Sequence, residues 1–400
     1  MELQPPTINQ PAGKPRILPP AKVPFGVNEM RLTANQWIAV FLAVLAVVEA
    51  VPVVWRHIER FKTGPDYRIP YKLSKDYWLF NRRMRQAAQG HKIVLLGDSV
   101  VWGEYVLPNG TLSHFLNQEE GATNLFINGG MDGLFPLAEE GLFKYYGQPL
   151  RRQKIILQCN LLWMTSPKVD LSDQKEEQFN HVSLVPQFYP RIPCYKAGAN
   201  DRLSIVVERE VPFLWWVAHL QNEFFDQRSI LHWTLEDDGG DPPQYPNVYK
   251  DPLRQISLTV PSAPRHDPLR GPDSPRHKPW FKRIPRPMQF DWVSTKSSLQ
   301  WQAFQSVVRN LRARGNNLLV ILGPFNEHLV AEDSRPAYLQ IRRAAEAWLR
   351  KQNIPTVVPQ TLPSALYADA SHPLTQGYQL LAQRIAHDKV FRQWLNRWSP

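Results

Sequence analysis

Residues 91–99 read His-Lys-Ile-Val-Leu-Leu-Gly-Asp-Ser, and this stretch decides the fold. A short apolar run without alternation is typical of a strand buried on both faces of a parallel sheet, and its glycine predicts a turn. Four further runs of this kind begin at Leu125, Lys154, Asn317 and, more weakly, Ile354. Segments with helical periodicity accompany them, at 297–314, 336–352 and 375–398. This alternation predicts an α/β protein whose parallel sheet is covered on both faces.

The carboxyl ends of these strands are where chemistry is expected. Ser99 would project into the crevice where α/β proteins bind ligands, and it needs an aligned base to act as a nucleophile. His372 is the candidate base. Asp369, three residues earlier, can fold back to accept its Nδ1 proton and leave Nε2 for the serine. Taken singly, an ordinary turn and a solvated histidine are the alternatives.

Two segments between these residues could stabilise an oxyanion. Asn128-Gly-Gly-Met-Asp-Gly133 follows the second strand and offers backbone N–H groups in a glycine-rich turn, at Gly130 and Gly133. Asn160 ends the third strand and can aim its amide at the same crevice. Taken singly, a tight turn and a strand-end cap explain these residues equally well.

The four signals follow one order along the chain, each at the end of a strand or in the last turn. In this the chain resembles the SGNH (GDSL-type) hydrolase superfamily, whose blocks carry Ser, Gly, Asn and His. The resemblance covers roughly residues 91–165 and 297–400. It implies a flavodoxin-like three-layer α/β/α sandwich. The third block departs from the usual Gly-x-Asn-Asp, since it reads Gln158-Cys-Asn-Leu161.

Carried over residue by residue, the resemblance implies a Ser-His-Asp triad and an oxyanion hole. Ser99 would be the nucleophile, and its own N–H would be one oxyanion donor. Gly133 would be the second donor, with Gly130 as a fallback, and Asn160 the third. His372 would be the base, oriented by Asp369.

Other residues near strand ends are weighed separately. Asn326 and His328 follow the fourth strand, where they could contact substrate or simply line a proline-stiffened loop. Cys159 alternates with Asn160 along its strand and is therefore expected in the core. Motifs for metal or nucleotide binding are absent from the sequence, so we expect no cofactor and no metal.

Residues 37–55 are predicted to be a transmembrane anchor. This stretch has Trp37 and Trp55 at its ends and Glu49 as its single charge. At 1.5 Å per residue it spans roughly 28 Å, close to the hydrocarbon thickness of a bilayer. A buried hairpin helix is the alternative. Charge does not set the orientation, because Lys and Arg flank both ends.

The remaining domain boundaries follow from composition. We expect a disordered tail over residues 1–36, a juxtamembrane connector over 56–90 and a catalytic domain over 91–400. This domain would carry an insertion at about 165–296, with an added apolar helix in 201–235. Residues 241–290 hold twelve prolines and nine Lys or Arg, which predicts a solvated basic loop. A clamp on an anionic polymer or lipid headgroup is the alternative.

Charge and cysteine content exclude some classes of protein and disfavour one class of partner. A formal charge of +11 permits contact with anionic lipid or polymer, but no nucleic-acid-binding motif is present in the sequence, so nucleic acid is not favoured. Two cysteines exclude a disulfide scaffold and a cysteine-rich metal domain.

Three functions remain open. The first is an esterase that cleaves an acyl ester of a carbohydrate or lipid. The second is an O-acyltransferase acting on a cell-envelope polysaccharide with a polytopic membrane partner. The third is a non-catalytic binding module. Resemblance to envelope-acylation proteins implies that the catalytic domain lies outside the cytoplasm.

Overall fold

The computed structural model describes residues 32–235, 250–260, 277–284 and 286–397. The chain divides into two compact units, residues 1–50 and 51–400. Most of the predicted tail, residues 1–31, lies outside the described residues. Helix α1, Ala34–Ile58, is the described helix that is long and apolar enough to cross a membrane, with 25 residues and a mean hydropathy of 2.5. It extends the predicted span by three residues at each end.

The predicted α/β class and its parallel sheet are confirmed. Five strands, all parallel, lie in the order β2-β1-β3-β4-β5. Their bounds are β1 Ile93–Leu96, β2 Phe126–Asn128, β3 Lys154–Cys159, β4 Asn317–Leu322 and β5 Thr356–Val357. In the sheet, β2 lies on one side of β1 and β3 lies on the other. The topological switch point therefore falls between β1 and β3. In doubly wound sheets, ligands bind at the carboxyl edge of this point.

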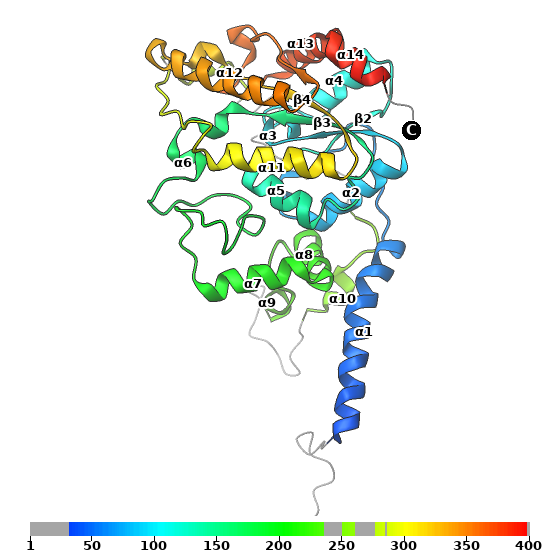
Figure 1. Ribbon diagram of the computed structural model, residues 1–400. Coiled ribbons are helices and arrows are strands. Elements are labelled where there is room, and N and C mark those ends of the chain that lie inside the picture. The colour runs from blue at the N-terminus through cyan, green and yellow to red at the C-terminus, as the bar shows by residue number, and fades with distance from the viewer. Residues whose placement is uncertain (1–31, 236–249, 261–276, 285, 398–400) are drawn as a thin grey trace, which may run out of the picture. The chain divides into compact units, whose positions relative to one another are not determined.

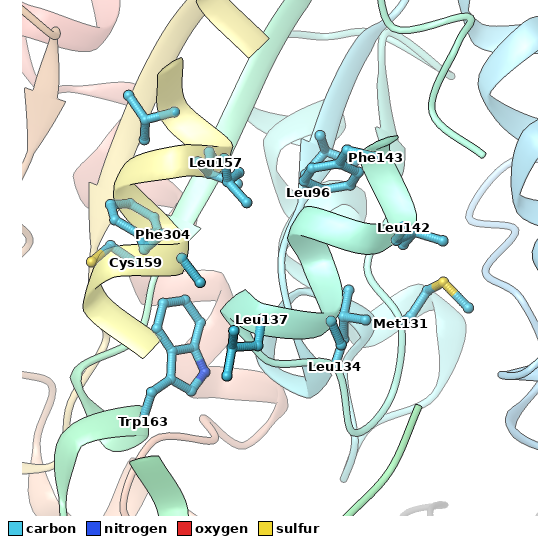
Figure 2. Packing of buried hydrophobic residues seen from close by; sticks show 14 of the residues in the cluster. Leu96, Met131, Leu134, Leu137, Leu142, Phe143, Leu157, Cys159, Trp163 and Phe304 are labelled. Carbon is cyan, nitrogen blue, oxygen red and sulfur yellow. The ribbon is translucent and has the colours of Figure 1, made fainter. Parts of the chain in front are cut away.

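Helices cover both faces of the sheet (Figure 1). One face carries α2 Tyr77–Gln89, α5 Pro136–Tyr145 and α11 Leu299–Ala313; the other carries α4 Leu112–Glu119, α13 Thr375–Ala386 and α14 Lys389–Asn396. Side chains of β3 alternate between the two faces: Leu157 joins the first core cluster and Ile156 the second. Figure 2 shows Leu157 and Leu96 among Phe143 of α5 and Phe304 of α11. This two-sided burial explains why the strands are apolar throughout.

Two segments differ from the prediction for local reasons. The stretch 375–398 forms two helices because the Asp388 carboxylate caps α14, accepting the Val390 N–H at 2.7 Å. The stretch 56–90, predicted as a connector, contains α2, which Asp76 caps in the same way by accepting the Leu79 N–H at 2.9 Å. Its buried face joins the sheet core, so this stretch belongs to the folded unit. Helix α12, Arg335–Lys351, lies where it was predicted.

The insertion at 165–296 is largely structured where it is described. The apolar segment at 201–235 forms three helices instead of one: α7 Ala199–Glu210, α8 Pro212–Phe224 and α9 Ile230–Leu235. Two short helices flank them, α6 Pro167–Asp170 and α10 Pro252–Gln255. Part of the proline-rich segment packs on the folded unit: Arg60 exchanges backbone hydrogen bonds of 2.7 and 3.0 Å with Leu258 and Val260. Residues 236–249 and 261–276, where a clamp could lie, are outside the described residues.

Candidate active site

Ser99 is the first residue of α3, Ser99–Trp102, directly after β1. Asp98 caps this helix, its Oδ1 accepting the Val100 N–H at 2.8 Å. Position 97 must be glycine because a Cβ there would lie 2.6 Å from the Val101 side chain and 2.9 Å from Gln158 Cβ. The sharp turn leaves Ser99 half-buried at the switch point, where a ligand can reach its hydroxyl.

Ser99, His372 and Asp369 form a continuous hydrogen-bonded chain. Ser99 Oγ lies 2.7 Å from His372 Nε2, across 273 positions of sequence. His372 Nδ1 lies 2.8 and 2.9 Å from the two carboxylate oxygens of Asp369. The three residues therefore have the geometry of a nucleophile, a base and the group that orients the base.

The Asp369–His372 turn is fixed on several sides. Asp369 Oδ1 accepts the backbone N–H groups of Ser371 and His372, both at 2.9 Å. From α13, Tyr378 donates to the Val100 carbonyl at 2.6 Å, which joins this end of the chain to α3. The imidazole is 5% exposed, and the Tyr105 ring packs edge-on against it at 5.2 Å. The imidazole is thus held in one orientation.

Asn326 and His328 each contact a backbone carbonyl and are not members of the Ser99–His372–Asp369 chain. Asn326 is fully buried, and its Nδ2 donates to the Asp369 carbonyl at 2.9 Å, so it supports the turn. His328 is exposed, and its Nε2 lies 3.0 Å from the Leu362 carbonyl, which can only accept. The prolyl loop after β4 therefore acts as a scaffold behind Asp369.

The glycine-rich loop after β2 is tied to the serine turn. Met131 N–H donates to the Gly97 carbonyl at 3.2 Å, and Asn128 Nδ2 donates to the Val101 carbonyl at 2.8 Å. Gly130 packs so closely that a Cβ would lie 2.5 Å from Trp102 N, and its own N–H is taken by Asn128 Oδ1 at 3.0 Å. Gly130 is thus a spacer between the two loops.

Gly133 carries a backbone N–H that is available as a hydrogen-bond donor. It adopts the left-handed region at φ 69°. Among the described residues, neither the Gly133 N–H nor the Ser99 N–H donates to a protein acceptor. Both amides can therefore give a hydrogen bond to a substrate.

Asn160 is fully buried, like Asn326, and Asp98 fixes its amide. Asp98 Oδ2 accepts from Asn160 Nδ2 at 2.8 Å and from Trp163 Nε1 at 3.0 Å. The second hydrogen of the Asn160 amide meets no acceptor within the described part of the chain. The departures of the third block are thus compensated in part, because Asp98 orients the amide. Cys159 is fully buried in the core, as predicted, and burial raises the pKa of its thiol.

Carboxylates dominate the electrostatics of the site. Burial opposes the charge of His372, but Asp369, Glu104 and Asp98 outweigh it and raise the pKa of the imidazole to about 10. Burial likewise opposes the charge of Asp369, yet His372 and two backbone N–H groups lower the pKa of this carboxyl to about 2. The pKa of Asp98 is raised by its burial. At neutral pH the pair is therefore an imidazolium and a carboxylate.

Sequence reasoning missed Glu104. Its Oε2 lies 3.3 Å from His372 Nε2, on the same ring nitrogen that meets Ser99. It follows Gly103, which takes φ 89° and turns the chain back toward the histidine. A glutamate five positions after the serine belongs to no motif, so only the tertiary structure reveals it.

The insertion also reaches the site. Arg283 Nη2 donates to the Ala368 carbonyl at 2.5 Å, next to Asp369. Trp280 N–H donates to the Tyr367 carbonyl at 2.8 Å, and His277 Nδ1 lies 2.5 Å from the Tyr105 carbonyl. This segment, predicted as a solvated loop, is docked against the turn that carries the base.

One described cluster has the ligand types of a metal site: Asp76, His219 and Glu223, with ligand atoms within 4.8 Å of one another. His219 Nδ1 lies 2.7 Å from Asp76 Oδ2, and its Nε2 lies 2.7 Å from Glu59 Oε1. Burial lowers the pKa of His219, but these two carboxylates more than reverse this and raise it to about 10. Both ring nitrogens of His219 are thus engaged by carboxylates, which makes this cluster a buried ion network in the structure.

No protein-family model matches this chain, and no curated protein matches it.

Proposed function

We propose that this chain is a membrane-anchored serine esterase of the SGNH type, which cleaves an acyl ester, foremost acetyl, of a carbohydrate or lipid. The observation that carries the proposal is the 2.7 Å contact between Ser99 Oγ and His372 Nε2, continued through Nδ1 to Asp369. Strand order, the serine turn and the Gly133 and Asn160 amides fit an SGNH fold. Helix α1 would hold the enzyme at a membrane, with the folded unit outside the cytoplasm.

The reaction would proceed through an acyl-enzyme. His372 Nε2 takes the Ser99 hydroxyl proton as Oγ bonds to the ester carbonyl carbon. The N–H groups of Ser99 and Gly133 and the Asn160 amide stabilise the resulting oxyanion. The bond to the alcohol then breaks, and the departing oxygen takes the proton from Nε2. Water repeats the sequence, releasing the carboxylic acid and restoring the serine.

Transfer to a sugar hydroxyl is the second candidate, making the protein an O-acyltransferase for an envelope polysaccharide. The feature that favours it is α1, since a membrane anchor would hold the acyl-enzyme beside a polytopic partner that supplies acyl groups. An acceptor alcohol would replace water in the second half of the reaction. Free acetate as the sole product in the presence of an oligosaccharide would count against transfer.

A fluorophosphonate probe tests whether the site is catalytic. We expect a covalent adduct at Ser99 of the full chain in detergent micelles, found by mass spectrometry, and none in Ser99→Ala. Ser297→Ala, which removes an exposed serine, is the matched control and should label normally. Because the neutral imidazole is the base, labelling should rise with pH toward 10. An unlabelled wild type at every pH would leave only a binding module.

A further inference from the structure

His181 is a buried histidine of the insertion that the proposed mechanism does not use. It is 2% exposed, and its Nε2 lies 2.8 Å from the Asp132 carbonyl. Its Nδ1 lies 3.0 Å from the Tyr77 hydroxyl. Burial lowers the pKa of His181 to about 4, so the ring is neutral at working pH.

The two contacts fix the tautomer of this ring. A carbonyl can only accept, so Nε2 carries the hydrogen and donates to Asp132. Nδ1 is then the acceptor of the Tyr77 O–H, and Ser183 Oγ donates to that hydroxyl in turn at 3.4 Å. The ring is therefore locked between two partners and cannot rotate without losing both.

The Asp132 carbonyl belongs to the same peptide group as the Gly133 N–H. In a trans peptide the C=O and the N–H point in opposite directions within one plane. A hydrogen bond that holds the carbonyl therefore also aims the N–H. It strengthens that N–H as a donor too, since hydrogen-bonded groups in a chain polarise one another.

Two further features show that the backbone is built around this contact. His181 adopts the left-handed region at φ 55°, which is uncommon for a residue other than glycine and is kept only where the surroundings require it. Its neighbour Asn180 packs so tightly on Gly133 that a Cβ there would lie 2.3 Å from Asn180 Nδ2. Asn180 and His181 thus contact the peptide group between Asp132 and Gly133 on two sides.

The loop also borders open space. A cavity of about 220 Å³ is lined by Asp132, Asn180 and His181 together with Tyr71 and Lys75. The residues that contact the 132–133 peptide group thus lie at the wall of a cavity and not in the interior of the core.

We propose that His181 is a positioning residue for the oxyanion hole, which aims and polarises the Gly133 N–H through its hydrogen bond to the Asp132 carbonyl. This inference rests on the proposed function, because it assigns a task within acyl transfer. A residue of the insertion would then help to orient a donor of the oxyanion hole.

The test compares His181→Phe, which cannot donate, with His181→Gln, whose amide can still donate to Asp132. Losing one oxyanion donor costs about 10²–10³ in rate, so we expect His181→Phe to lower kcat by about tenfold to a hundredfold, with KM little changed. Affinity for a boronic acid, which forms a tetrahedral adduct with the serine, should fall by a similar factor. His181→Gln should recover a large part of both losses.

A readout independent of catalysis accompanies these measurements. Hydrogen–deuterium exchange of the peptide covering residues 128–135 should quicken in His181→Phe and return toward wild type in His181→Gln. Tyr77→Phe, which removes the other partner but keeps the Asp132 contact, should have the smaller effect on kcat.

The outcomes separate the two proposals. An active wild type with an equally active His181→Phe variant overturns this inference alone, as does a loss that His181→Gln fails to restore. A wild type that neither labels at Ser99 nor hydrolyses esters overturns the proposed function and this inference together.

Discussion

Replacing Glu104 by glutamine should move the pH dependence of the proposed esterase activity. Glu104 Oε2 lies 3.3 Å from His372 Nε2, and its negative charge favours the protonated imidazole. The base must be neutral to accept the serine proton, so activity should follow the loss of this proton. With the pKa of His372 raised to about 10, most of the imidazole is protonated at pH 7.

The size of the effect follows from the ranking of the charges around the ring. Burial lowers the pKa of His372, whereas Asp369 raises it most, followed by Glu104 and Asp98. The Tyr105 ring packs edge-on against His372, and the Arg283 guanidinium lies over that Tyr105 ring. A close carboxylate shifts a pKa by about 1–3 units, and Glu104 is second to Asp369. Glu104→Gln should therefore shift the acidic limb of the pH–rate profile to lower pH by about one unit.

The assay is kcat/KM for an activated acetyl ester, measured from pH 6 to pH 10.5. At pH 7 the variant should be about tenfold faster than wild type, since a shift of one unit makes ten times more imidazole neutral. Exposed Glu176→Gln controls for the change in net charge and should leave the limb in place. The reasoning would be refuted if the acidic limb of Glu104→Gln lay at the same pH as in wild type. It would also be refuted if Glu176→Gln shifted the limb by the same amount.

Two further predictions concern buried contacts. Asn326→Ala removes the 2.9 Å hydrogen bond from the Asn326 amide to the Asp369 carbonyl. It should lower kcat by about tenfold and leave KM unchanged. A rise in KM with kcat unchanged would instead identify Asn326 as a substrate contact. His219→Phe leaves Glu59 and Asp76 without their shared cation and should lower the free energy of unfolding by about 3–5 kcal/mol, measured with urea. In wild type the pKa of His219 is raised to about 10. The free energy of unfolding that its positive charge contributes is therefore fully present below about pH 6.5 and is lost as pH rises through 10. A loss of unfolding free energy in His219→Phe that stays constant from pH 6 to pH 10.5 would contradict this.

The strands and the triad could be predicted because their determinants are local. Each strand is an apolar run, and its end fixes which side chains share the carboxyl edge of a parallel sheet. Ser99 and Asn160 follow neighbouring strands, whereas His372 follows no strand and its place beside Ser99 was predicted from the resemblance to SGNH hydrolases. The contact between Asn160 and Asp98 follows from the pairing of β1 with β3.

Other parts of the site could not be predicted, because their contacts join distant loops. His181 and Arg283 lie in the insertion, where no periodicity indicates which part of the core they meet. Asn326 was assigned correctly to the sheet edge, but its side chain turns to the Asp369 carbonyl. Helix α2 was missed because it is rich in Arg and Gln, although Asp76 is a recognisable N-cap.

The docking of residues 277–283 against the turn of Asp369 bears on how this protein can be divided. Trimming the proline-rich stretch to obtain a minimal domain would remove the contacts that Arg283 and Trp280 make to the backbone just before Asp369 and His372. A shortened chain could keep its sheet and melt cooperatively, yet hold its imidazole loosely. We therefore expect the shortest piece that folds to be shorter than the shortest piece that holds His372 in place.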